Sequence, residues 1–185
     1  MKDDLLDYLR TAREALVWKL DGLSEHDARR PLTSSGSNLL GIVKHMALVE
    51  GAYFGEVFDR PVGALFAEDD EPNSDMWATA AESRELVVST YQRVWAHSEA
   101  TIAALDLTAP GRVRWWRGAP EVTLHRVLVH VVAETHRHAG HCDLLRELVD
   151  GAAGYSVRDD GLPEVPEGYW PSYVARLQAV ADGFR

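Results

Sequence analysis

Apolar residues recur every three or four positions along most of the chain, which is the spacing of one face of an α-helix. In the first such segment they are Leu5, Leu6, Leu9, Ala12, Leu16 and Leu20. The pattern predicts helices over about residues 3–21, 38–57, 74–105 and 124–149. The alternation of apolar and polar residues that is typical of strands is not prominent, and no internal repeat is seen. The chain is therefore predicted to be all-α, with these helices packed as a four-helix bundle.

Proline and glycine residues mark where the predicted bundle ends. Gly151 and Gly154 follow the last long apolar stripe, and glycine is the usual residue after a helix. The segment "GLPEVPEGYWPSY" that comes next is expected to be irregular, before a short amphipathic helix at about 172–182. We therefore expect the bundle at residues 1–152 and a C-terminal extension at 153–185 that packs on it.

The predicted helix at 124–149 carries an unusual polar interruption, "ETHRHAGH". With Glu134 placed at zero on a helical wheel, His138 falls at about 40° and His141 at about −20°. Apolar residues on the same helix lie near the same line, among them Val127, Val131 and Leu145. The three polar side chains are therefore predicted to lie on the face that packs against the core.

A buried carboxylate needs compensation from a salt bridge, hydrogen bonds with water, or a cation. Glu134 and His138 are one turn apart, so their head groups can converge on one ion. Zinc accepts two histidines and a carboxylate and keeps a fourth position open in catalytic sites. The third ligand has to come from another helix, and His45 is the best candidate because it lies between Ile42 and Val49 on an apolar face. From the residues alone, a hydrogen-bonded polar core remains the alternative to a metal site.

The composition of the chain argues against several classes of binding partner. The formal net charge of −10 argues against a nucleic acid and against an anionic membrane surface. No apolar run reaches the roughly 20 residues that span a bilayer, and the N-terminus lacks the pattern of a signal peptide, so we expect a cytoplasmic protein. Cys142 is the one cysteine, which excludes an intrachain disulfide and a Cys-x-x-Cys site. We interpret it as a small core residue rather than a nucleophile.

Two stretches of the sequence resemble the DinB-like superfamily, and in particular an actinobacterial branch of it. They are "WKLDGLSEHDARRPLTSSGSNLLGIVKHMALVEGAYFGEVFDRP" and "ETHRHAGHCDLLRELVDG", and the similarity is clearest over residues 5–152. The resemblance implies a four-helix bundle that holds a divalent metal, zinc or nickel. It also implies that the ligands are His45, Glu134 and His138. A set of two histidines and one glutamate is similar to that of the mycothiol-dependent maleylpyruvate isomerase group.

The same resemblance implies a chemistry. Mycothiol and bacillithiol S-transferases of the superfamily bind a small thiol at the metal, where coordination deprotonates it and makes it a nucleophile. Mycothiol would then be the cosubstrate, an electrophile the acceptor, and His141 a fourth ligand, a group that orients a ligand, or the acceptor of the thiol proton. A homodimer is also implied.

Other functions remain open at this point. A hydrolase or an isomerase can use the same metal site, and a non-enzymatic stress protein can hold a structural ion. The sequence does not determine whether Trp115, Trp116 and the "GYW" segment at 168–170 close over the site.

Overall fold

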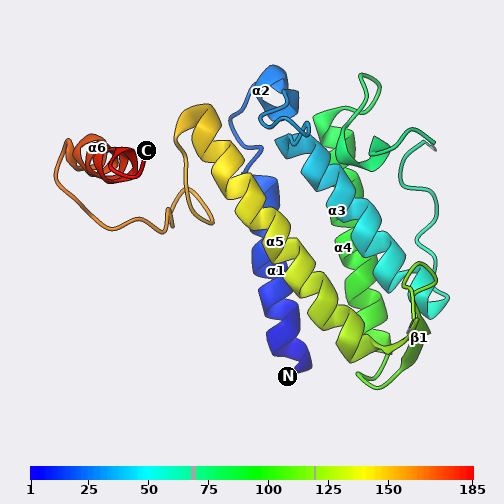
Figure 1. The fold of residues 1–185 in the computed structure, drawn as a ribbon. Helices are drawn as coiled ribbons and strands as arrows, with labels where there is room; N and C mark the ends of the chain where they lie inside the picture. Colours follow the sequence, from blue (N-terminus) through cyan, green and yellow to red (C-terminus); the bar gives the residue numbers. More distant parts are fainter. Residues whose placement is uncertain (68–69, 119) are drawn as a thin grey trace.

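The computed structural model describes residues 1–67, 70–118 and 120–185, and these residues are mostly helical (Figure 1). The prediction of a helical protein is confirmed, and a two-stranded sheet is added to it. Asn38 caps its helix by accepting a hydrogen bond from the backbone of Gly41, and Thr123 caps another by accepting from Arg126. The elements are α1 (Lys2–Trp18), α2 (Glu25–Arg29), α3 (Leu39–Phe54), η1 (Glu56–Phe58), η2 (Ser74–Met76), α4 (Arg84–Ala104), β1 (Pro110–Arg112), β2 (Glu121–Thr123), α5 (Leu124–Asp150) and α6 (Tyr169–Asp182).

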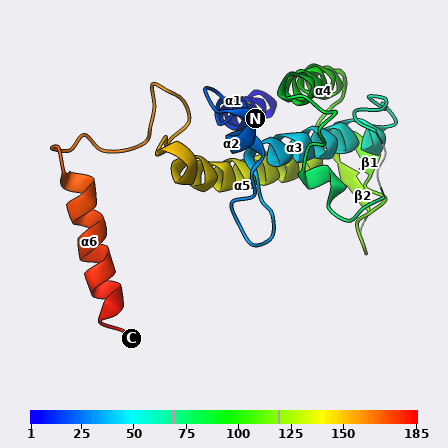
Figure 2. The same cartoon turned by 90° about the horizontal axis from the view of Figure 1, so that it is seen from above.

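The helix α3 contacts both α4 and α5, and α5 also contacts α1 (Figures 1 and 2). The chain runs in opposite directions along α3 and α5, as the colours of Figure 1 show. Buried apolar side chains fill the space between these helices in two clusters. The largest of them include Leu9, Leu16, Leu39, Leu40, Ile42, Met46, Phe54, Tyr91 and Ile102.

A buried ion pair joins α1 to α3. The guanidinium of Arg13 donates to both carboxylate oxygens of Glu50, and both side chains are almost completely buried. Arg13 also donates to Glu99 on α4 over 3.1 Å, and Arg10 donates to the same carboxylate from the solvent side. Removing one member of such a pair would leave a buried charge without its partner, so the network fixes how these helices pack.

The helix predicted at 74–105 begins later than expected, because α4 starts at Arg84 with Ser83 as its cap. The residues before it form the short η2 and an irregular segment. Side chains of other elements occupy the carbonyl groups that a longer helix would have used: Arg29 donates to the carbonyls of Ala78, Thr79 and Glu82. The sequence-based start of this helix was therefore wrong, and the tertiary hydrogen bonds explain why.

The hairpin of β1 and β2 leads into α5. The two strands pair antiparallel with Gly111 opposite Val122. A Cβ atom at Gly111 would lie 2.6 Å from the ring of Phe58, so glycine allows the hairpin to approach η1 closely. The hairpin connection carries Trp115 and Trp116.

The start of the C-terminal extension contacts the long helices. The ammonium group of the buried Lys19 donates to the carbonyl of Gly154 and forms an ion pair with Asp143 at 2.7 Å. The helix α6 stands apart from the other helices, and none of its residues is buried (Figures 1 and 2). The division of the chain at residue 152, with residues 153–185 packed on the preceding helices, stays a prediction.

Within the part of the chain that the structure describes, none of the helices combines the length and the apolar character that a membrane crossing requires.

Candidate metal centre

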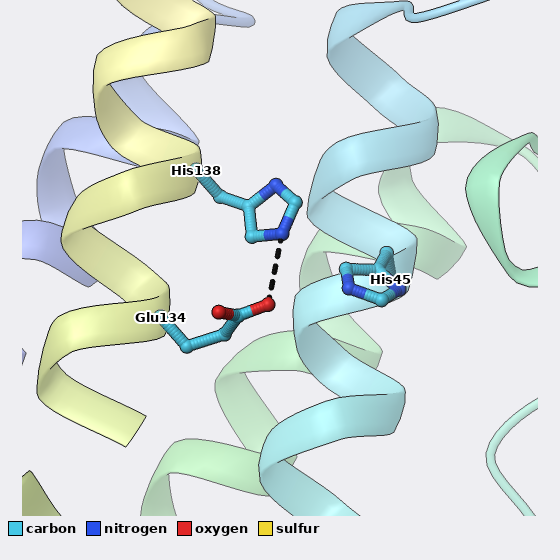
Figure 3. Close-up of side chains that lie close together, drawn as sticks. All are labelled: His45, Glu134 and His138. Atoms are coloured by element: carbon cyan, nitrogen blue, oxygen red, sulfur yellow. Dashed lines mark hydrogen bonds and ion pairs between the residues drawn. The ribbon is translucent and has the colours of Figure 1, made fainter. Parts of the chain in front are cut away.

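Three side chains that the sequence singled out meet between α3 and α5 (Figure 3). Each of His45, Glu134 and His138 offers a ligand atom, and these atoms all lie within 4.8 Å of one another. Nε2 of His138 lies 3.2 Å from Oε1 of Glu134. Two ligands of a tetrahedral zinc ion with bonds of about 2.0–2.1 Å are about 3.3 Å apart, so this pair already has the required separation. The third donor comes from His45 on α3, across the interface with α5.

The cluster lies at the rim of the core rather than in its middle. The His138 side chain is 11% exposed, that of His45 17% and that of Glu134 29%. Each of the three side chains is therefore partly exposed to solvent, although the protein covers most of its surface. This position suits a site with an open coordination place better than a closed structural site.

The helical wheel predicted the direction of the buried face of α5 slightly wrongly. The buried face of α5 is centred near Cys142, which is fully buried and lies about 80° around the helix from Glu134. His141, on the other side of Glu134, is exposed. The reason is that α5 packs against α1 as well as α3, so its buried face is turned toward both. The prediction that His141 faces the core was therefore wrong.

The surroundings of His138 favour a neutral imidazole, which is the form that binds metals. Burial lowers the pKa of His138, and the nearby His45 lowers it further, while Glu134 opposes both effects. Its second ring nitrogen, Nδ1, is buried and has no hydrogen-bond partner among the described residues.

A residue that the sequence analysis missed orients His45. Oδ2 of Asp75, in η2, lies 2.7 Å from Nδ1 of His45. A proton on Nδ1 then bonds the carboxylate and leaves the lone pair on Nε2, the nitrogen that faces Glu134 and His138 in Figure 3. Metal-binding histidines commonly have such a carboxylate partner. The acidic composition of the segment before α4 was the one available signal, and it did not indicate which carboxylate would be used.

The segment that carries Asp75 is held firmly against α3. Lys44 donates to the carbonyls of Ser74 and Trp77 over 3.1 and 3.0 Å, and Asn38 donates to the carbonyl of Met76 over 3.2 Å. A Cβ atom at Gly41 would lie 1.8 Å from that same carbonyl oxygen, so only glycine permits this approach. These contacts fix the backbone on both sides of Asp75, so its carboxylate is held in place beside His45.

The family model for mycothiol-S-transferases matches residues 4–151 of this sequence, which include all three clustered residues. The chain belongs to the mycothiol-S-transferase family. Its predicted membership of the DinB-like superfamily is thereby confirmed. Among curated proteins none matches this sequence.

In this mycothiol-S-transferase family member, His141 lies beside the cluster rather than within it. Its ring meets that of His138 edge to face, with centroids 5.3 Å apart. The three residues that lie within 4.8 Å of one another do not include it. As an exposed base next to the site, His141 remains predicted as a proton acceptor or an orienting group.

The lone thiol of the chain is not placed for chemistry in this family member. Cys142 is fully buried, and burial raises the pKa of its thiol far above the ordinary value. A thiol that stays protonated in the core is a poor nucleophile. This agrees with its interpretation as a core residue, and any reactive thiol has to come from a substrate.

Proposed function

We propose that this protein transfers mycothiol to an electrophile at a divalent metal ion held by His45, Glu134 and His138. The observation that carries the proposal is the convergence of two partly exposed imidazoles and a partly exposed carboxylate from two helices. Membership of the mycothiol-S-transferase family supports the choice of thiol. The separation of Nε2 of His138 from Oε1 of Glu134 supports the fit of a metal ion.

Zinc is the proposed ion, with nickel as the alternative. Two nitrogen donors and one oxygen donor, with a fourth position free, match a catalytic zinc site. A metal bound here would lower the pKa of a coordinated thiol and so supply a thiolate at neutral pH. This thiolate would then be the nucleophile, which the buried Cys142 is not suited to provide.

The residues of the chain have separate tasks in this proposal. His45 and His138 bind through neutral imidazoles, and Glu134 supplies negative charge that offsets the cation. Asp75 keeps His45 in the tautomer whose Nε2 faces the site. His141 is exposed beside His138 and is proposed to take the proton that the thiol releases.

The proposal also includes the type of fold, the cellular location and the oligomeric state of the protein. We infer a four-helix bundle of the DinB type built from α1, α3, α4 and α5, supported by the contacts that link these helices. A cytoplasmic location is inferred because the lone cysteine is a free thiol and the cosubstrate is itself a thiol. A homodimer is inferred from the superfamily alone, and light scattering during gel filtration would test it.

The first experiment measures metal content by inductively coupled plasma mass spectrometry after loading with zinc or nickel. About one ion per chain is expected in the wild type, and the ion should be lost in His45→Ala. His125→Ala is the matched control, because His125 is exposed on α5 outside the cluster. Retention of the ion by His45→Ala would overturn the ligand assignment.

The second experiment measures thiol transfer to monochlorobimane with mycothiol, with cysteine, and without a thiol. Transfer that requires mycothiol and the metal is expected. Metal-dependent turnover of an ester or of an isomerase substrate without any thiol would instead favour a hydrolase or an isomerase on the same site. A stable bound ion with no activity of any kind would favour a non-enzymatic metal-binding protein.

A further inference from the structure

A group of aromatic side chains lies next to the candidate metal centre along the same interface. His130 is one turn before Glu134 on α5, about 6 Å along the helix axis. Its ring lies 4.8 Å from that of Tyr53, on α3, and 5.0 Å from that of Trp116. His130 and Tyr53 thus belong to the same two helices as Glu134 and His45.

The hydroxyl of Tyr53 is the polar atom at the centre of this aromatic group. The indole N–H of Trp116 donates to it over 2.8 Å, and that of Trp115 over 3.3 Å. A phenol oxygen that accepts two hydrogen bonds still has its own hydrogen to donate. Among the described residues, no hydrogen bond donated by Tyr53 is found. The two indoles therefore orient a hydroxyl that is free to donate.

The aromatic group is closed on the core side and open on the other. Tyr53 is 7% exposed, and Trp116 packs against the apolar core. Trp115 is 47% exposed although both its ring and its N–H contact Tyr53. Small-molecule sites commonly combine an apolar wall with a few oriented polar groups. The exposed indole of Trp115 beside the oriented hydroxyl of Tyr53 has this combination.

We propose that Tyr53, Trp115, Trp116 and His130 form the subsite for the electrophile, and that they select a flat, conjugated carbonyl compound. This inference rests on the proposed thiol transfer. The aromatic rings would pack against the plane of the acceptor, and the free O–H of Tyr53 would bond its carbonyl oxygen. His130 lies about one helical turn from Glu134, and this spacing leaves room for the sulfur between the metal centre and the acceptor.

The reaction that fits this subsite is conjugate addition. The thiolate sulfur attacks the carbon β to the carbonyl, and a C–S bond forms. The electron pair of the C=C bond moves so that the carbonyl oxygen gains negative charge, which the Tyr53 O–H stabilises. The proton released by the thiol returns to the carbon α to the carbonyl. The sum is a thiol plus an enone giving a thioether, with no oxidant or reductant.

Binding of a product tests the subsite without any turnover. Isothermal titration calorimetry would compare two thioethers on the metal-loaded protein, S-methylmycothiol and the conjugate of mycothiol to benzylideneacetone. Neither can bind the metal as a thiolate, and the conjugate adds the phenyl ring and the carbonyl of the acceptor. In the wild type the conjugate is expected to bind about threefold to tenfold more tightly than S-methylmycothiol, the range of one aromatic contact. Trp115→Ala should remove most of this difference and leave the affinity for S-methylmycothiol unchanged. Tyr53→Phe should remove part of it, because one hydrogen bond is lost.

Trp170→Ala is the matched control, since Trp170 is a partly exposed tryptophan on α6, away from the long helices. It should keep the full difference between the two ligands. If S-methylmycothiol binds but the conjugate binds no better, the subsite is refuted and the proposed thiol transfer stands. If Trp115→Ala weakens S-methylmycothiol as much as the conjugate, the aromatic wall holds the thiol and the assignment to the acceptor is wrong. If mycothiol itself does not bind to the metal-loaded wild type, the proposed function fails and the subsite fails with it.

Discussion

Asp75 and His45 are 30 positions apart in the sequence, and their Oδ2 and Nδ1 atoms lie 2.7 Å apart. The contact orients the one histidine that α3 contributes to the candidate metal centre. It depends on the segment from Ser74 to Trp77, which Lys44 and Asn38 hold on the surface of α3. A carboxylate outside the cluster thus takes part in building it.

Asp75→Asn is expected to weaken zinc binding about 10-fold to 100-fold, because the amide is a poorer acceptor for Nδ1–H of His45. Competition with a chromogenic chelator would measure the affinity. Asp70→Asn changes another acidic residue before α4 and should bind zinc like the wild type. Equal affinities in both variants would show that Asp75 does not support His45.

Glu134→Gln is expected to lose the metal while the fold survives. The amide keeps the shape of the side chain but removes the negative charge that offsets the cation. Zinc should raise the melting temperature of the wild type by mass action and leave that of Glu134→Gln unchanged. The melting temperatures of the two metal-free proteins should be similar. A normal zinc-dependent shift in the variant would remove Glu134 from the ligand set.

Cys142 is expected to resist thiol reagents in the folded protein, because it is fully buried and its pKa is raised by burial. Dithionitrobenzoate should release about one equivalent of chromophore only after guanidinium is added. Cys142→Ala should retain mycothiol transfer. Rapid labelling of the native protein, together with loss of transfer in Cys142→Ala, would point to a protein thiol in the reaction.

Glu99 is expected to make stability depend on pH in the acid range. The hydrogen bond from Arg10 lowers the pKa of Glu99, and the charges of Arg10 and Arg13 act in the same direction against the effect of burial. A carboxyl with a lowered pKa in the folded state stabilises the fold above its unfolded-state pKa, and this contribution is lost as the pH falls through the folded-state pKa. The stability difference between wild type and Glu99→Gln should therefore be constant near neutral pH and shrink below about pH 4. Urea unfolding at a series of pH values would measure it, and a difference independent of pH would contradict the expected charge interaction.

Local periodicity is enough to identify the parts of the centre that lie on one helix. The spacing of four residues puts Glu134 and His138 on adjacent turns whatever the rest of the protein does. The interruption of an apolar stripe also marked His45, because a histidine between Ile42 and Val49 needs a polar partner. The helix caps at Asn38 and Thr123 likewise depend only on neighbouring residues, because each side chain bonds the backbone three residues further on.

Tertiary structure decided everything that depends on contacts between distant segments. The direction of the buried face of α5 was set by the joint packing of α1 and α3, which turned His141 outward and Cys142 inward. The late start of α4 and the position of Asp75 came from side chains of α2 and α3 that bind carbonyl groups of the preceding segment. The contact of Trp115 with Tyr53 required the hairpin to fold back on η1. Helix periodicity is a property of neighbouring residues, whereas these contacts exist only after the chain has brought remote groups together.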